Sequence, residues 1–160
     1  MNAQALIKGF NYNAEVIHEQ LRDVNHEESL IQPIANSHSI NWLLGHILSS
    51  RTIPLRRVNA EPVWTEEQRA RYRNGSAPIG ADGEGVLTLP KLIELFTLAH
   101  ERLVTGLATL NNDYLNSLSD HKNNTFFESF NYFQFHETYH IGQMTIIAEF
   151  LGKPSRYLKG

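Results

Sequence analysis

Two histidines four residues apart, His136 and His140, are the side chains best placed for chemistry in this sequence. Residues 125–152 around them predict a helix, which turns about once every 3.6 residues. Residues i and i+4 therefore lie on one face, one above the other, where two imidazoles can bind one metal ion. The alternative is that the pair only lines a polar patch of the core. Because the helix is otherwise apolar, we favour metal binding.

A third ligand must come from elsewhere in the chain. There is no cysteine, so a transition-metal site has to combine histidine with carboxylates or water, and disulfides and thiolate nucleophiles are excluded. His46 lies within residues 40–48, which are apolar on almost every side and should be buried. A buried histidine needs a polar partner, and residues 37–57 contain no acid that could provide one. His46 is therefore the third candidate ligand.

The segment between His136 and His140 also matches H-E-x-x-H, the zinc-protease motif in which the glutamate is the general base. A metzincin would have glycine and histidine at the positions of Gln143 and Ile146. A protease also needs a substrate-binding sheet, and no strand pattern is present. We expect that Glu137 does not bind the ion, because it lies about 100° around the helix from His136. It should instead support a ligand or contact another helix.

A dinuclear carboxylate site is a second alternative. Two Glu-x-x-His pairs are present, Glu137 with His140 and Glu15 with His18. Such a site also needs a carboxylate from each of two other helices, and the second helix has none to give. Glu15 and His18 also fall off the apolar stripe of their own helix. A mononuclear site therefore remains.

Three neutral imidazoles with an open position are typical of catalytic rather than structural sites. The expected cofactor is one divalent transition-metal ion, zinc or nickel first, with iron, cobalt and manganese also compatible with imidazole. Three polar residues could support the ligands, although packing alone would also explain them. Gln143 shares the ligand face of its helix, Tyr139 lies at the edge of that face, and Asn13 interrupts the apolar stripe of the first helix.

Four apolar stripes at helical spacing predict an all-α four-helix bundle in a single domain over residues 1–160. A long connection over residues 59–88, rich in glycine and proline, leaves room for a crossover between the second and third helices and could close over a site. The predicted helices cover residues 3–24, 37–57, 89–110 and 125–151.

Helix boundaries are signalled by capping residues. Ser37, Thr88 and Thr125 are the expected N-caps of the second, third and fourth helices. Gly152 and Pro154 are expected to end the last helix.

Composition excludes several functional classes. A formal net charge of -3 at pH 7 does not suggest a nucleic-acid partner. No apolar run approaches the length of a membrane span, and the N-terminus lacks the apolar region of a signal peptide. A chain without cysteine is compatible with the cytoplasm, the location that we expect.

Two motifs together resemble the DinB-like family: Asn-Trp-Leu-Leu-Gly-His at residues 41–46 and His-Glu-Thr-Tyr-His-Ile-Gly-Gln at residues 136–143. Phe-Asn-Tyr-Asn at residues 10–13 is similar to the first helix of that family, so the resemblance covers nearly the whole chain. It implies a four-helix bundle, frequently a homodimer, with one divalent metal ion. The implied ligands are His46, His136 and His140.

The resemblance also suggests a reaction. Relatives include transferases of bacillithiol and other low-molecular-weight thiols and a mycothiol-dependent maleylpyruvate isomerase, while many members have no assigned reaction. The expected activity is metal-dependent transfer of a small thiol to an electrophilic small molecule. Two alternatives stay open: a hydrolase that uses metal-bound water, and a stress-associated metal-binding or interaction protein without turnover. An exchangeable metal position with a thiol-dependent spectral change would favour the enzyme.

Overall fold

A computed structural model describes residues 2–119 and 124–153. In these residues the protein is helical, with no strand beyond one isolated β-bridge between Leu118 and Thr125, which confirms the all-α prediction. Within the same residues, no helix combines the length and the apolar character needed to cross a membrane. The long helices are α1 (Ala3–Leu21), α3 (Ile40–Arg57), α5 (Leu89–Thr109) and α7 (Phe126–Phe150), and the short ones are α2 (His26–Ser29), α4 (Glu66–Ala70) and α6 (Asn112–Asn116).

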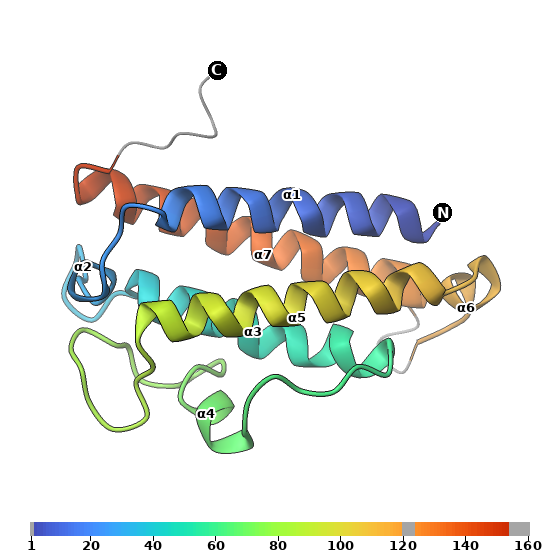
Figure 1. Cartoon of the computed structure of the whole chain (residues 1–160), viewed down its shortest axis with the longest axis horizontal. Coiled ribbons are helices and arrows are strands. Elements are labelled where there is room, and N and C mark those ends of the chain that lie inside the picture. Colours follow the sequence, from blue (N-terminus) through green and yellow to red (C-terminus); the bar gives the residue numbers. More distant parts are fainter. Residues whose placement is uncertain (1, 120–123, 154–160) are drawn as a thin grey trace.

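Each long helix packs against two others. α1 lies against α5 and α7, and α3 lies against the same two helices. Figure 1 shows that α3 and α5 run in one direction while α1 and α7 run in the other. The connection over residues 58–88 therefore has to return the chain to the level at which α3 begins, and it carries α4, which contacts α3.

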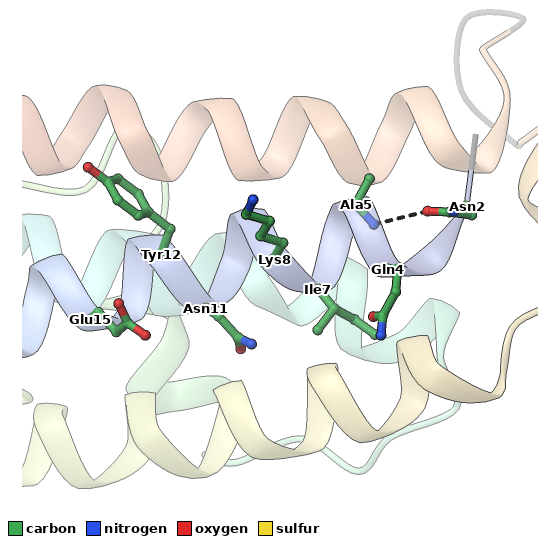
Figure 2. Close-up of a pocket in the computed structure, with 9 residues that line it drawn as sticks. Asn2, Gln4, Ala5, Ile7, Lys8, Asn11, Tyr12 and Glu15 are labelled. Carbon is green, nitrogen blue, oxygen red and sulfur yellow. Dashed lines mark hydrogen bonds between the residues drawn. The ribbon is translucent and has the colours of Figure 1, made fainter.

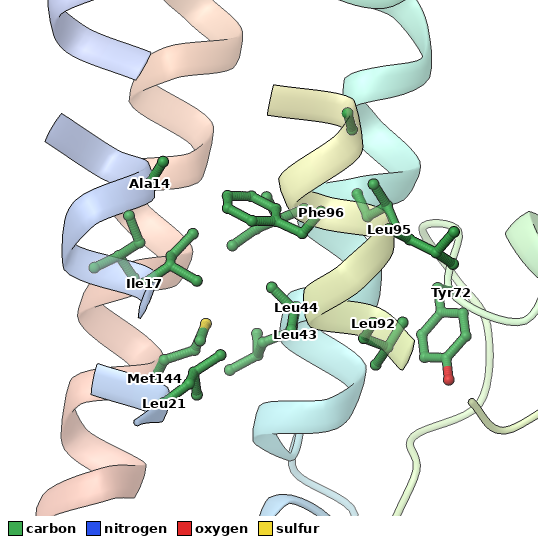
Figure 3. Close-up of a cluster of buried hydrophobic side chains, with 14 of the residues drawn as sticks. Ala14, Ile17, Leu21, Leu43, Leu44, Tyr72, Leu92, Leu95, Phe96 and Met144 are labelled. Carbon is green, nitrogen blue, oxygen red and sulfur yellow. The ribbon is translucent and has the colours of Figure 1, made fainter. Parts of the chain in front are cut away.

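The predicted apolar stripes form the core. Side chains from all four long helices meet in the cluster of Figure 3, and burying each large one contributes about 1.5–3 kcal/mol. Residues 40–49 of α3 are buried without exception, because the 58–88 connection covers the side of α3 that no long helix reaches. Tyr72 and Ile79 of that connection are themselves buried.

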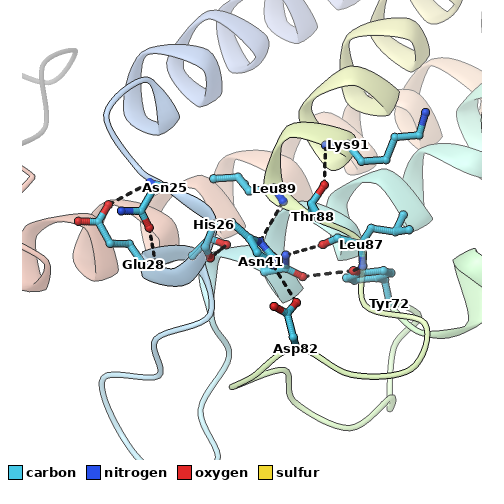
Figure 4. Close-up of polar contacts among 11 residues, drawn as sticks. Asn25, His26, Glu28, Asn41, Tyr72, Asp82, Leu87, Thr88, Leu89 and Lys91 are labelled. Carbon is cyan, nitrogen blue, oxygen red and sulfur yellow. Dashed lines mark hydrogen bonds and ion pairs between the residues drawn. The ribbon is translucent and has the colours of Figure 1, made fainter.

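Polar bonds fasten the connection to the ends of the helices (Figure 4). The Tyr72 hydroxyl donates to Asn41 Oδ1 at 3.2 Å and accepts from the Leu87 amide at 2.7 Å. Asn41 Nδ2 in turn donates to the Leu87 carbonyl at 2.9 Å, and His26 in α2 bonds Asp82 at 2.8 Å. The connection is thus held at several points although most of it has no regular structure.

The prediction that Ser37 caps the second long helix is wrong. Ser39 is the N-cap of α3, and its side chain accepts a hydrogen bond from the Trp42 amide. Ser37 belongs instead to the preceding turn, where its amide donates to the Ile34 carbonyl at 2.9 Å. Because Ser37 is part of that turn, the helix begins at Ile40, three residues later than predicted.

The other boundary signals act largely as predicted. Thr88 caps α5, and Thr125 forms a capping box at the start of α7. Gly152 follows α7 with a φ of 73°, a left-handed conformation that glycine adopts without strain. Pro154, the second expected stop signal, lies outside the described residues. α1 ends about one turn before its predicted end.

Candidate metal centre

The three predicted histidines converge at one place. His46 comes from the middle of α3, and His136 and His140 come from successive turns of α7. One ring nitrogen of each lies within 4.8 Å of the others. The Nε2 atoms of His136 and His140 are 3.1 Å apart, and the ring centre of His46 lies 5.2 Å from that of His136 and 4.9 Å from that of His140. Among the described residues, no other group of three or more metal-ligating side chains is close enough to hold an ion.

Two of the rings are oriented by hydrogen bonds at Nδ1. His46 Nδ1 bonds the Tyr72 carbonyl at 3.0 Å, and His140 Nδ1 bonds Gln143 Oε1 at 2.6 Å. Both partners are oxygen acceptors, so each Nδ1 carries the proton and each Nε2 presents a lone pair. This is the arrangement in which an imidazole binds a metal through Nε2 while its other nitrogen is held by a hydrogen bond.

The surroundings keep the imidazoles neutral. Burial lowers the pKa of His46 and His136, and burial lowers the pKa of His140 to about 4 although its bond to Gln143 acts in the opposite direction. Neutral imidazole is the form that binds a metal. A divalent ion among the rings would accept all three lone pairs at once, so these residues fit such an ion.

An aromatic stack covers one side of the site. Trp42 lies parallel to His46 with ring centres 4.7 Å apart, and His38 stacks on the other face of Trp42 at 3.7 Å. The indole nitrogen of Trp42 donates to Ser76 Oγ at 3.0 Å, so a residue of the 58–88 connection holds the stack. The stack shields the His46 ring from water.

The three supporting candidates play different parts. Gln143 bonds His140 directly. The Tyr139 ring packs edge-on against His140 with centres 5.1 Å apart, although more than half of Tyr139 is exposed. Asn13 is buried but does not reach a histidine: its Nδ2 donates to the Gln134 carbonyl at 2.9 Å and lies 3.5 Å from Glu137 Oε2. Asn13 therefore joins α1 to α7 beside the site.

Glu137, between the two α7 histidines in sequence, points away from them into the core. Its carboxylate accepts two hydrogen bonds from Arg51 of α3, from Nε at 2.6 Å and from Nη2 at 3.0 Å. The Arg51 and Glu137 side chains are 0% and 1% exposed. The guanidinium also lies over the Phe96 ring, 4.1 Å from its centre. Of the two roles expected for Glu137, contact with another helix is the one observed.

Arg51 is a residue that the sequence reasoning missed. A signal was available, because Arg51 is the first charged residue of an otherwise apolar helix and follows His46 by five positions. An arginine inside such a helix has to find a buried anion. The bidentate bond ties α3 to α7 within about one and a half turns of the ligands on both helices.

The second Glu-x-x-His pair takes no part in this cluster. Glu15 and His18 are exposed on α1, and the His18 ring instead packs edge-on against Phe96 at 5.9 Å. A surface hollow of about 1030 Å³ also lies along α1 and is lined by Asn2, Ile7 and Lys8 among others (Figure 2). None of the three histidines lines it, so it offers the site nothing.

Tyr72 makes Gly45, the neighbour of His46, intolerant of a larger residue. A Cβ added at Gly45 would lie 2.1 Å from Cδ1 of the buried Tyr72 ring. We expect Gly45→Ala to lower the free energy of unfolding by about 1–3 kcal/mol and to weaken metal binding, because displacing Tyr72 also moves the carbonyl that orients His46. Urea unfolding and metal titration would measure both effects. Gly142→Ala is the control, because a Cβ there meets nothing within 4 Å; equal losses in the two variants would contradict the prediction.

Comparison with known proteins agrees with this architecture. The sequence model of the DinB superfamily matches residues 10–144. Among solved structures, the chain is similar to one described as a conserved protein from Enterococcus faecalis, with a TM-score of 0.74 and 15% sequence identity. The likeness covers 96% of this chain and 99% of that one, and at this identity it shows the fold alone. A search of curated proteins found no match.

Proposed function

The chain belongs to the DinB superfamily, and from that premise we propose that it binds one divalent transition-metal ion and transfers a low-molecular-weight thiol to an electrophilic small molecule. The observation that carries the proposal is the convergence of His46, His136 and His140, with two of the rings held at Nδ1 so that Nε2 presents its lone pair to the centre of the cluster. Three protein ligands leave at least one position for a substrate. Zinc and nickel are the first choices, and iron, cobalt and manganese also suit imidazole ligands.

The chemistry divides between the ion and the protein. When bound, a divalent ion supplies Lewis acidity that favours the thiolate form of a thiol near neutral pH. The chain has no cysteine and cannot supply a thiolate itself. Its own residues orient the ligands through Tyr72 and Gln143 and keep water from His46 through the Trp42 stack.

Transfer can be tested with a panel of thiols and an aromatic acceptor such as 1-chloro-2,4-dinitrobenzene. In that reaction a carbon–sulfur bond forms, the carbon–chlorine bond breaks, chloride leaves and the thiol proton passes to the buffer. The protein is loaded in turn with Zn²⁺, Ni²⁺, Fe²⁺, Co²⁺ or Mn²⁺. With at least one combination of metal and thiol, its transfer rate should be at least about tenfold higher than that of His136→Ala. If no combination gives a higher transfer rate than the variant, the proposal of thiol transfer is wrong. Metal-assisted hydrolysis, or metal binding without turnover, would then take its place.

We further propose that the helical arrangement is a four-helix bundle in a single domain, with residues 58–88 as the crossover. Each long helix packs on two others, and α3 and α5 run in the same direction, which a short hairpin could not achieve (Figure 1). A cytoplasmic location remains a prediction.

A homodimer is also proposed, through an apolar stripe on α7. Its large side chains are each more than half exposed and follow one another three or four residues apart, as in the seam of a coiled coil. We expect light scattering to give twice the chain mass of 18.3 kDa, and Phe135→Glu to give monomers. A monomeric parent protein would contradict the proposal. The stripe consists of Tyr132, Phe135 and Tyr139.

A further inference from the structure

An apolar pocket of about 320 Å³ lies beside the candidate metal centre. It is formed by the turn before α3, by the first turns of α3 and by the second half of α7, and it has no assigned role in the site described above. Its size is at the lower end of the range for small-molecule sites, about 300–1,000 Å³. Residues that line it include Ile34, His38, Leu43, Gln143, Ile146 and Ile147.

Two side chains connect this pocket to the three histidines. Gln143 lines the pocket and bonds His140 Nδ1 at 2.6 Å. His38 also lines it and stacks on Trp42, which in turn stacks on His46. A molecule in the pocket would therefore contact Gln143, which holds the His140 ring, and His38, whose ring belongs to the stack that covers His46.

The lining favours an uncharged, apolar ligand. It contains no Asp, Glu, Lys or Arg, and burial lowers the pKa of His38, which keeps that ring neutral at pH 7. Ile34 and Ile146 are 74% and 67% exposed, although both are large and apolar. A bound apolar molecule would remove part of their surface from water, which contributes about 25 cal/mol for each Å².

We propose that this pocket binds a small uncharged aromatic molecule with one edge directed past Gln143 toward the three histidines. Flat aromatic rings suit a pocket whose wall includes the His38 ring, which is itself stacked on Trp42. That the bound molecule is the acceptor of the thiol rests on the proposed function. Binding itself rests only on the pocket.

Binding can be measured without metal or thiol. The chain has two tryptophans, so Trp64→Phe leaves Trp42 as the only indole, next to the pocket wall. In this background, metal-free protein is titrated with fluorobenzene, and Trp42 emission and the ¹⁹F signal of the ligand are followed. We expect saturable binding, and binding of 4-fluorobenzoate at least about tenfold weaker because its carboxylate has no Lys or Arg partner in the pocket. No saturation, or equal binding of the two ligands, would overturn the proposal.

A matched pair of variants locates the binding. Ile146→Gln places a polar group in the pocket and should weaken fluorobenzene binding by about tenfold. Phe150→Gln lies one turn later on α7, is similarly exposed at 63% against 67% and does not line the pocket, so affinity should not change. Both variants should have the same mass in solution, which removes any effect of dimer formation. Equal losses in the two variants would place the binding elsewhere.

The transfer assay separates this proposal from the proposed function. If transfer occurs, Ile146→Gln should raise KM for the aromatic acceptor by about tenfold with little change in kcat, while Phe150→Gln leaves both unchanged. If fluorobenzene binds as expected but no metal and thiol give transfer, the pocket stands and the proposed function falls. If transfer occurs without saturable fluorobenzene binding, the pocket proposal falls alone.

Discussion

Replacing His46 with alanine is expected to lower the affinity for a divalent ion by at least about a hundredfold while the protein stays folded. Loss of a residue that only orients a ligand already costs about 10–100-fold in affinity, and loss of a ligand should cost more. His46 is the only one of the three histidines that comes from α3, so its removal leaves two ligands on a single helix. Isothermal titration against a competing chelator, together with elemental analysis, would measure the change.

The control for this variant is His18→Ala. His18 is exposed on α1 and belongs to the second Glu-x-x-His pair, so a mononuclear site predicts unchanged affinity and a dinuclear site predicts a loss. Metal should also stabilise the parent protein, by about 2.7 kcal/mol when the free ion is at a hundredfold excess over Kd, and so raise its melting temperature. It should not do so in His46→Ala. Full metal occupancy in His46→Ala would remove the proposed geometry.

The ligand pair could be predicted because its geometry is local. The four-residue spacing of His136 and His140 fixes their shared face as soon as the segment is helical, and the same argument placed Gln143 beside them. His46 followed from a chemical requirement, since a buried imidazole in a segment without acids needs a partner. That partner could not be predicted. It is the backbone carbonyl of Tyr72, in an irregular connection, and every residue type has such a carbonyl.

The fold was predictable to a similar extent. Apolar stripes and capping residues predicted where four long helices lie, because both signals depend on neighbours within one or two turns. They did not predict which helices touch, since a stripe shows which face is buried but not against what. The displaced start of α3 has the same origin. Ser37 and Ser39 are equally good caps in the sequence, and the turn that closes on Ile34 decides between them.

The second large effect concerns the ion pair behind the histidines. We expect Glu137→Gln to lower the free energy of unfolding by about 3–5 kcal/mol, because it keeps the shape of the side chain but leaves the buried Arg51 guanidinium without a counter-charge. Domains are stable by only about 5–15 kcal/mol, so the loss should be evident in urea unfolding and in the melting temperature. Arg51→Met should cost a similar amount, since it leaves the carboxylate uncompensated.

The double variant Arg51→Met/Glu137→Leu decides whether the charge or the packing matters. If the single losses come from an unpaired buried charge, removing both charges should recover most of the stability, because apolar replacements of buried pairs are often neutral or stabilising. If the double variant is as unstable as the sum of the single ones, packing and the position of Arg51 over Phe96 account for the effect. Lys91→Ala is the control: its partner Glu94 is 66% exposed, and such surface pairs contribute about 0–1 kcal/mol.

Metal stoichiometry in Glu137→Gln separates the ion pair from the metal centre. The carboxylate faces Arg51 rather than the three imidazole nitrogens, so folded Glu137→Gln should still bind about one ion per chain at a temperature well below its melting point. A zinc-protease arrangement predicts the same stoichiometry but a loss of catalysis, because its glutamate acts as the base. Loss of the ion itself from a folded variant would instead make Glu137 a metal ligand. It would contradict the assignment of Glu137 to the ion pair with Arg51 and of metal binding to the three histidines.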